Sequence, residues 1–312
     1  MFKRLTKNRF KYQKKLIGNS KENGLLYNLF IYFLLIVIGF VFLYPIIYML
    51  STSLMSNLDL VNFKIKWFPS KIYFENYLIA YKALALPKSV FTTIFVSLVA
   101  TITMIISSSL IGFGLGRFDF PGKKIVFILL IFSYIMPKTL FLIPTYQIYT
   151  KLKLRNSILG LIIPILLGQG IQGAFFIFIF YQFFKMIPKD LEEAAIIDGA
   201  SSFKFFYKVA IKMAMPALVI AFVFSFSLYW NEINLYSIYM NGQYKTLPML
   251  LGNLRDLYYS EATGNTQIDP NLRFSEAKAY AGTLISIVVP IIIFSIVQKW
   301  FVESIDKSGI TG

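Results

Sequence analysis

The chain contains no cysteine and no histidine. These absences exclude disulfide bonds, thiolate nucleophiles, imidazole bases and zinc sites of the ordinary nitrogen and sulfur kind. Charged residues make up only 15% of the 312 residues, whereas an average soluble domain has about 25%. Hydrophobic residues reach 57%, which excludes a disordered chain. A lipid bilayer is therefore the expected solvent.

Long apolar runs dominate what is present. Six of them reach the roughly 20 residues that a helix needs to cross the hydrocarbon of a bilayer. They cover residues 29–50, 90–115, 125–148, 158–184, 213–240 and 279–298. Only Lys138 and Glu232 carry charge inside these runs, because ionised groups are costly at membrane depth. The sequence predicts an all-α membrane protein with six transmembrane helices.

Positive charge predicts the orientation of these helices. The first run follows a basic tail but has 22 residues and no small-residue cleavage site, so we expect an uncleaved anchor. With this tail in the cytoplasm, 18 Lys and Arg lie inside and 12 outside. The external loop with Lys151, Lys153 and Arg155 goes against this bias. We predict cytoplasmic tails over 1–28 and 303–312, on either side of a transmembrane domain over 29–302 in the cell membrane.

The net charge of +16 would also suit a nucleic-acid ligand. The basic residues lie in loops between apolar runs, however, where membrane orientation accounts for them. No nucleic-acid partner is expected.

A polar segment between the fourth and fifth runs, residues 187–212, carries the strongest local signal. Pro188 and Asp190, with Glu193 three residues after Asp190, predict a helix start with a capping box. Gly199 permits a chain reversal, and Ser201 or the serine after it can cap a second helix. We expect a helix, a turn and a second helix outside the bilayer.

Two interpretations of this segment remain open from the residues alone. Small Ala194 and Ala195 beside Glu192 and Glu193 would fit a partner's groove and offer it a carboxylate. An amphipathic hairpin resting on lipid is comparable, although an anionic leaflet would repel the acidic first helix.

The same segment resembles the permease subunits of ABC importers. Their signature is EAA, three residues, Gly, nine residues, then Ile-x-Leu-Pro, and Glu193-Ala-Ala-Ile-Ile-Asp-Gly199 fits its first part. Val209-Ala-Ile211 keeps the later apolar pair, but Lys212 replaces the proline and Pro216 matches a second proline of the family.

Further segments, in their order and spacing, are similar to the MalG-like branch of carbohydrate-uptake permeases. At the end of the chain, Thr311 stands where that branch usually has Lys. The similar segments are Glu75-Asn-Tyr77, Arg117-Phe-Asp-Phe-Pro-Gly122, Ile143-Pro-Thr-Tyr146, Leu154-Arg-Asn-Ser157, Gln182-Phe-Phe184, Trp230-Asn-Glu232, Thr246-Leu-Pro248 and Ser308-Gly-Ile310.

The resemblance implies a permease that forms half of the pathway for a sugar or oligosaccharide, without catalytic residues, a cofactor or a metal. Its implied partners are a second, MalF-like permease, two ABC ATPase subunits, an extracytoplasmic solute-binding protein and the lipid bilayer. The chain has no Walker A motif, so a partner must bind the ATP. The implied ATPase-coupling residues are Glu192, Glu193, Ala194, Ala195, Asp198 and Gly199.

Polar and aromatic residues at membrane depth are candidates for the cargo pathway. The glutamines could bind hydroxyl groups or join helices, and the aromatic pair could stack on a sugar or anchor the interface. Lys138 and Glu232 could neutralise each other or reach the outer interface or a wet cavity separately. The candidates are Gln169, Gln172, Tyr229, Trp230, Asn231, Glu232 and Lys138.

Glycine spacing offers one misleading motif. Residues 168–173 read G-x-G-x-x-G, but a dinucleotide turn needs a strand before it and this motif lies inside an apolar run. Close helix packing is the expected role, as it is for Gly112, Gly114 and Gly116.

Two alternative functions stay open at this point. One is an ABC permease for a peptide or another polar solute. The other is a stand-alone secondary transporter or channel, although the internal repeat frequent in secondary transporters is not evident.

The topology can be tested directly because the chain has no native cysteine. Cysteines introduced at Lys7, Ser201 and Ser308 should be shielded from an impermeant thiol reagent in intact cells, whereas cysteines at Ser70 and Thr263 should react. Labelling at Ser201 from outside would overturn the orientation.

Overall fold

The structure, a computed structural model, describes residues 18–19, 22–65, 67–240, 244–256 and 274–309. Most of the basic tail, with Lys7, lies outside the described residues, as do Thr263 and Thr311. The chain divides into two compact units, residues 1–77 with 268–281, and residues 78–267 with 282–312. The regular secondary structure of the described chain is helical apart from one two-residue antiparallel pairing, β1 (Gly18–Asn19) with β2 (Glu22–Asn23).

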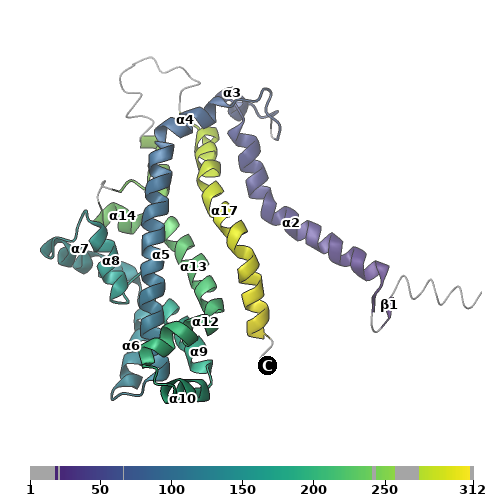
Figure 1. The fold of residues 1–312 in the computed structure, drawn as a ribbon. Helices are drawn as coiled ribbons and strands as arrows, with labels where there is room; N and C mark the ends of the chain where they lie inside the picture. Colours follow the sequence, from purple (N-terminus) through teal and green to yellow (C-terminus); the bar gives the residue numbers. More distant parts are fainter. Residues whose placement is uncertain (1–17, 20–21, 66, 241–243, 257–273, 310–312) are drawn as a thin grey trace, which may run out of the picture. The chain divides into compact units, whose positions relative to one another are not determined.

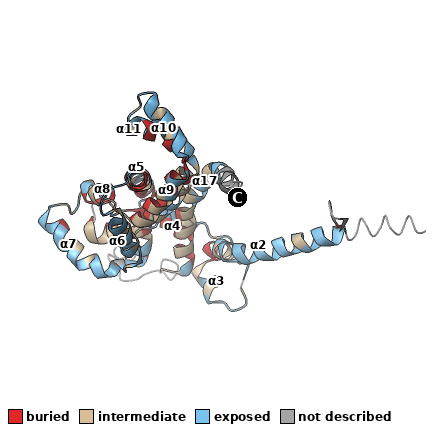
Figure 2. Cartoon of the chain, turned by 90° about the horizontal axis from the view of Figure 1, so that it is seen from below, coloured by how far each residue is buried: buried red, intermediate tan, exposed pale blue. Residues whose placement is uncertain are grey.

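The first unit is dominated by one long apolar helix that makes few contacts of its own. Figure 2 shows it pale blue over most of its length, and its most apolar stretch has no buried residue. Beyond its end, the Asn76 amide donates to the carbonyls of Ser53 and Met55, both at 2.9 Å. The helices of this unit are α2 (Leu25–Ser53), α3 (Asn57–Val61) and the first residues of α4 (Glu75–Ala83) and α17 (Glu276–Gly309).

The second unit is built around α5, which packs against α8, α9, α13 and α15. Figure 1 shows α5 as a long, nearly straight helix with shorter helices beside it. Its elements besides the remainder of α4 and α17 are α5 (Leu86–Arg117), α6 (Lys123–Ile135), η1 (Lys138–Phe141), α7 (Leu142–Lys151), α8 (Ile158–Leu166), α9 (Gly173–Met186), α10 (Lys189–Ile197), α11 (Ser202–Phe205), η2 (Phe206–Ala210, a π-helical turn), α12 (Ile211–Met213), α13 (Met215–Trp230), α14 (Asn234–Tyr239) and α15 (Leu247–Gly252).

Glycines allow α5 and α9 to approach closely. A Cβ atom at Gly112 would lie 2.7 Å from Phe180 Cβ, and one at Gly116 would lie 3.3 Å from the Tyr181 carbonyl oxygen. Nothing lies within 4 Å of a Cβ atom at Gly114. The packing role predicted for these glycines therefore holds for Gly112 and Gly116 but not for Gly114.

By length and composition, three described helices can each cross a membrane. They are α2, α5 and the part of α17 from Glu276 to Trp300, and two bent pairs raise the number to as many as five. The predicted apolar runs thus coincide with helices, but three of the runs are interrupted.

The third run, predicted as one span over 125–148, is sharply bent. α6 ends at Ile135, and the helical segment from Thr139 to Lys151 is bent from it by 95°. Pro137 has no N–H for the helical ladder and forces the residue before it out of the helical region, and Met136 has ψ 130°.

The fourth run, expected over 158–184, is also broken. α8 ends at Leu166 and α9 begins at Gly173, so the glycine motif forms a loop instead of a packed helix. Gly168 has φ +79° and Gln172 has φ +55°, values that no right-handed helix contains.

The fifth run is shorter than the predicted 213–240. The helical segment before it, Ser202–Met213, is bent by 77° from α13. α13 ends at Trp230 and is followed by the separate α14. Pro216, in the first turn of α13, cannot donate to the carbonyl four residues earlier, so the ladder opens there.

The glycine contacts predict different changes in the unfolding free energy for two nearby substitutions. Gly112→Ala should separate α5 from α9 and lower the unfolding free energy by about 1–3 kcal/mol, the usual cost of overpacking. Gly114→Ala adds the same methyl group on the open side and should be neutral. Thermal unfolding of the purified chain in detergent measures both, and equal melting temperatures would contradict the close approach.

Candidate functional site

Residues 187–212 form the helical hairpin that the sequence predicts. α10 ends at Ile197, and Gly199 reverses the chain with φ +72°. Ser201 begins the second helix, because its hydroxyl accepts the backbone N–H of Lys204 at 3.3 Å. We call this element the hairpin.

The predicted capping box at the start of the hairpin is wrong. Pro188, which has no side-chain acceptor, occupies the cap position, and Asp190 already lies in the first helical turn. The acidic residues of this turn still favour the helix, since they face the positive end of its dipole.

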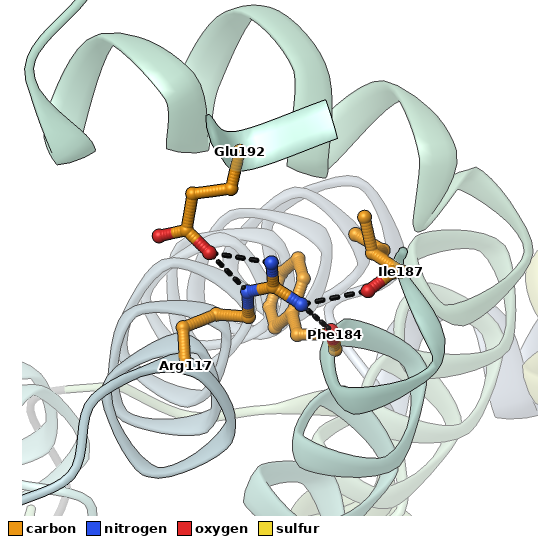
Figure 3. A network of polar contacts seen from close by, with 4 residues as sticks. All are labelled: Arg117, Phe184, Ile187 and Glu192. Carbon is orange, nitrogen blue, oxygen red and sulfur yellow. Dashed lines mark hydrogen bonds and ion pairs between the residues drawn. The ribbon is translucent and has the colours of Figure 1, made fainter. Parts of the chain in front are cut away.

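A buried arginine from another helix fixes the start of the hairpin (Figure 3). Arg117, the last residue of α5, donates from Nε to Glu192 Oε2 at 2.8 Å, and its Nη2 binds the same oxygen. Its Nη1 donates to the Ile187 carbonyl at 2.7 Å and to the Phe184 carbonyl at 3.4 Å. The side chains of Arg117 and Glu192 are only 4% and 18% exposed. We call these contacts the arginine clamp.

The clamp has a clear electrostatic reason. Phe184 and Ile187 lie at the C-terminal end of α9, where carbonyls lack helical partners and carry partial negative charge. The guanidinium is therefore compensated by a carboxylate and by the end of a helix. Hydrogen bonds between ionised groups are stronger than neutral ones.

Aromatic rings extend the attachment of the hairpin to α5. The Phe113 ring centroid lies 5.4 Å from that of Phe184 in α9 and 5.0 Å from that of Phe206. The guanidinium carbon of Arg117 lies 5.9 Å above the ring of Phe205. The three phenylalanines named with Phe113 are also buried, so both arms of the hairpin are anchored on α5 and α9.

The opposite surface of the hairpin is open. Glu193, Ala194, Asp198 and Gly199 are exposed and Ala195 is half-buried. Large apolar side chains are exposed beside them, with Ile197 at 84% and Phe203 at 67%. An acidic and apolar surface of this kind is suited to contact a protein partner.

A second ion pair lies in the connection between α5 and α6. Lys123 Nζ donates to Asp119 Oδ1 at 3.0 Å, on the exposed surface. This hydrogen bond and the positive charge of Lys123 hold the pKa of Asp119 below its ordinary value. The pair has no part in the arginine clamp and offers a matched control for it.

The broken fourth run forms the other notable feature, which we call the interrupted loop (residues 167–172). The Tyr229 hydroxyl accepts the N–H of Ile171 at 3.1 Å, and the Tyr236 hydroxyl donates to the Tyr229 carbonyl at 3.0 Å. A side chain at Gly170 would collide with Met104 and with the Tyr229 hydroxyl. The loop is therefore packed tightly against α5 and α13.

The predicted pathway residues have different environments. Gln169 and Asn231 are exposed and Gln172 is half-buried, whereas Tyr229 and Trp230 are buried. Glu232 is half-buried, and its Oε1 accepts the N–H of Leu235 at 2.7 Å, which caps α14. The side chain of Lys138 lies outside the described part of the chain, so its pairing with Glu232 stays a prediction.

Comparison with known families decides the assignment. The family described as binding-protein-dependent transport system inner membrane component matches residues 108–308. The chain belongs to this family. It is thus an ABC importer permease, and it shares the permease family's lack of a catalytic function.

Individual relatives are similar to this permease over most of its length. The arabinooligosaccharides transport system permease protein AraQ of Bacillus subtilis is 25% identical, over 88% of this chain and 93% of its own. The sulfoquinovosyl glycerol transport system permease protein SmoH of Agrobacterium fabrum is 28% identical, over 86% and 89%.

A solved structure shares the fold. It is a crystal structure of a bacterial ABC transporter involved in the import of the acidic polysaccharide alginate. One of its chains aligns with a TM-score of 0.67 at 23% identity, over 88% of this permease and 96% of that chain.

Arg117 is the permease residue that sequence reasoning missed. It was noted only as the first residue of a similar segment, and its partner Glu192 is 75 positions away. The available signal was a basic residue at the C-terminal end of a long apolar helix, followed by a connection with exposed charges.

Two roles of Tyr229 can be separated by one substitution. Tyr229→Phe keeps the ring but leaves the Ile171 N–H without its acceptor, which should lower the unfolding free energy by about 1–3 kcal/mol and slow uptake. If Tyr229 acted in uptake only by stacking its ring on cargo, uptake would stay unchanged, because phenylalanine keeps the ring. Tyr134→Phe, which removes the hydroxyl of a half-exposed tyrosine, is the control. Thermal unfolding and uptake of labelled cargo measure the difference.

Proposed function

We propose that this permease forms half of the translocation pathway of an ATP-driven importer for a sugar or oligosaccharide. Its fellow subunits are a second permease, two ATPase subunits and an extracytoplasmic solute-binding protein. ATP hydrolysis belongs to the ATPase subunits, and this chain performs no covalent chemistry. Support for the cargo comes from the relatives, whose names give arabinooligosaccharides and sulfoquinovosyl glycerol as what they transport.

The hairpin is the observation that carries the mechanism. Its first helix and turn lie outside the apolar helices and expose Glu193 and Ile197, and the first helix is attached to α5 on its other side. We infer that the exposed surface docks into an ATPase subunit and that Glu193 contacts a basic residue there. Ala194, Ala195 and the turn at Gly199 let the two chains approach closely. Closure of the ATPase dimer then moves the hairpin and rotates the helices attached to it.

The transmembrane arrangement that fits this function has six spans. In this arrangement the three long helices, the bent pair over 123–151 and α13 are five spans, and the shorter apolar α9 together with α8 is the sixth. Both termini and the hairpin then lie in the cytoplasm, and the transmembrane domain covers 29–302. The cargo is expected to pass the interrupted loop, where Gln169 and Gln172 offer hydrogen bonds, and the outer end of α13, where Asn231 and Glu232 lie.

The family assignment favours this importer over a stand-alone transporter or channel. Stable co-purification of ATPase subunits and vanadate-sensitive uptake are the expected results, whereas uptake driven by an ion gradient through this chain alone would contradict them. The chemical identity of the solute that the cognate binding protein retains would decide between a sugar and a peptide or other polar solute.

Docking is tested by reversing one exposed charge. Glu193→Lys brings like charges together in the proposed contact and should reduce retention of the ATPase subunits, with sugar uptake lost. Asp119→Lys reverses an exposed acidic residue in the neighbouring connection and should retain both. Gly199→Pro is a second variant, which should misplace α11 because proline cannot adopt φ +72°.

Purification through a tag on the partner permease, followed by quantification of bound ATPase, makes the measurement. Neither residue lies in an apolar helix, so membrane insertion should survive. Normal ATPase retention and normal uptake in both hairpin variants would defeat the docking role.

A further inference from the structure

We propose that Arg117 is a positioning residue that makes the hairpin and α5 move as one body, and that the two adjacent glutamates of α10 have separate tasks. Glu192 attaches the hairpin to α5 within this chain, and Glu193 contacts the ATPase subunit. The inference rests on the proposed docking function and adds how motion passes from the docked hairpin to the membrane helices.

The environments of the two glutamates differ as this division requires. The Glu192 side chain is 18% exposed and both of its bonds to Arg117 end on Oε2. Glu193 is exposed, and no ion pair engages it among the described residues. Neighbours on a helix with 3.6 residues per turn point about 100° apart, so one can face α5 while the next faces a partner.

Arg117 is placed to join three helix ends (Figure 3). It closes α5, donates to the last carbonyls of α9, and binds the first turn of α10. The guanidinium is a planar fork that can bind acceptors on two sides, whereas a lysine ammonium on its flexible stem cannot reproduce that geometry. A displacement of α10 is therefore passed to α5 and α9 together.

The other contacts of α5 connect the clamp to the interrupted loop. Ser107, nearly three turns before Arg117, donates from Oγ to the carbonyl of Leu166 at 3.0 Å, where α8 ends. Met104, one turn further, fills the space beside Gly170. One rigid helix thus touches the hairpin at its end and the proposed cargo region part-way along its length.

A clamp that only stabilised the fold and a clamp that transmits motion predict different outcomes. If the clamp only stabilised the fold, its loss would reduce the amount of assembled transporter, and the transporter that did assemble would work normally. The ratio of solute transported to ATP hydrolysed separates the two, because it is independent of the amount of protein.

The test uses the complete transporter in liposomes, with its loaded binding protein. Glu192→Gln should retain the ATPase subunits, since Glu193 is intact, and should hydrolyse ATP. The ratio of uptake to hydrolysis should fall about fivefold or more, the scale of a coupling between two sites. Arg117→Lys should likewise retain the ATPase subunits, hydrolyse ATP and show a lower ratio of uptake to hydrolysis. Asp119→Asn, which removes only the exposed pair with Lys123, should leave the ratio unchanged.

Cross-linking positions 117 and 192 tests whether a connection without the ion pair restores the ratio of uptake to hydrolysis. Because the chain has no cysteine, Arg117→Cys with Glu192→Cys can be joined by a bifunctional maleimide, using partner subunits without accessible cysteine. The unlinked double variant should be uncoupled, and linking should restore the ratio without restoring the charges. If Arg117→Lys does not assemble, Glu192→Gln and the linked pair decide the question.

Three results would overturn the proposal. An unchanged ratio in Glu192→Gln would deny transmission, and so would a link that restores nothing. Loss of ATPase subunits in Glu192→Gln, to the extent seen in Glu193→Lys, would make both glutamates docking residues. Failure of the docking function itself is recognised separately, by normal ATPase retention and uptake in Glu193→Lys.

Discussion

The structure depends on one constraint: hydrocarbon offers no hydrogen bonds, so each break in an apolar helix must find partners within the protein. Tyr229 accepts the N–H of Ile171 in the interrupted loop, and Glu232 caps the helix that follows α13. Arg117 serves the carbonyls at the end of α9. Residues whose chemistry pointed to cargo or to membrane orientation thus also satisfy the backbone groups left without helical partners at these breaks.

The sequence predicts the positions of the apolar helices and the form of the hairpin well, because both follow from local properties. Hydropathy over about 20 residues locates a span, and Gly199 with Ser201 marks a turn and a helix start. The breaks in these helices are harder to predict from the sequence. Residues 167–172 carry two glutamines but no charge, so they do not interrupt the apolar run. Their loop depends on contacts with Met104 and Tyr229 from distant parts of the chain.

The failure of the predicted cap has the same origin. A local pattern made Asp190 a plausible cap residue, but the cap position falls two residues earlier, at Pro188, and the helix begins at Lys189. Arg117 binds the carbonyl of Ile187 and the carboxylate of Glu192, which fixes the backbone on both sides of Pro188. A tertiary ion pair thus overrides the local preference. A partner 75 positions away leaves no trace in a local motif.

The clamp also explains how the hairpin can be preorganised in the absence of a partner. An arginine that is 4% exposed needs its carboxylate in the isolated chain, because an unpaired buried charge costs several kcal/mol, about 3–5 when one partner of a buried pair is removed. Glu192 is therefore tied to this chain whether or not an ATPase is present. Glu193 and Ile197 are exposed on the other side and need no partner for the fold. Since the backbone beneath them is already fixed by Arg117 and the phenylalanines around Phe113, docking loses little conformational entropy, and more of the contact energy remains to hold the subunits together.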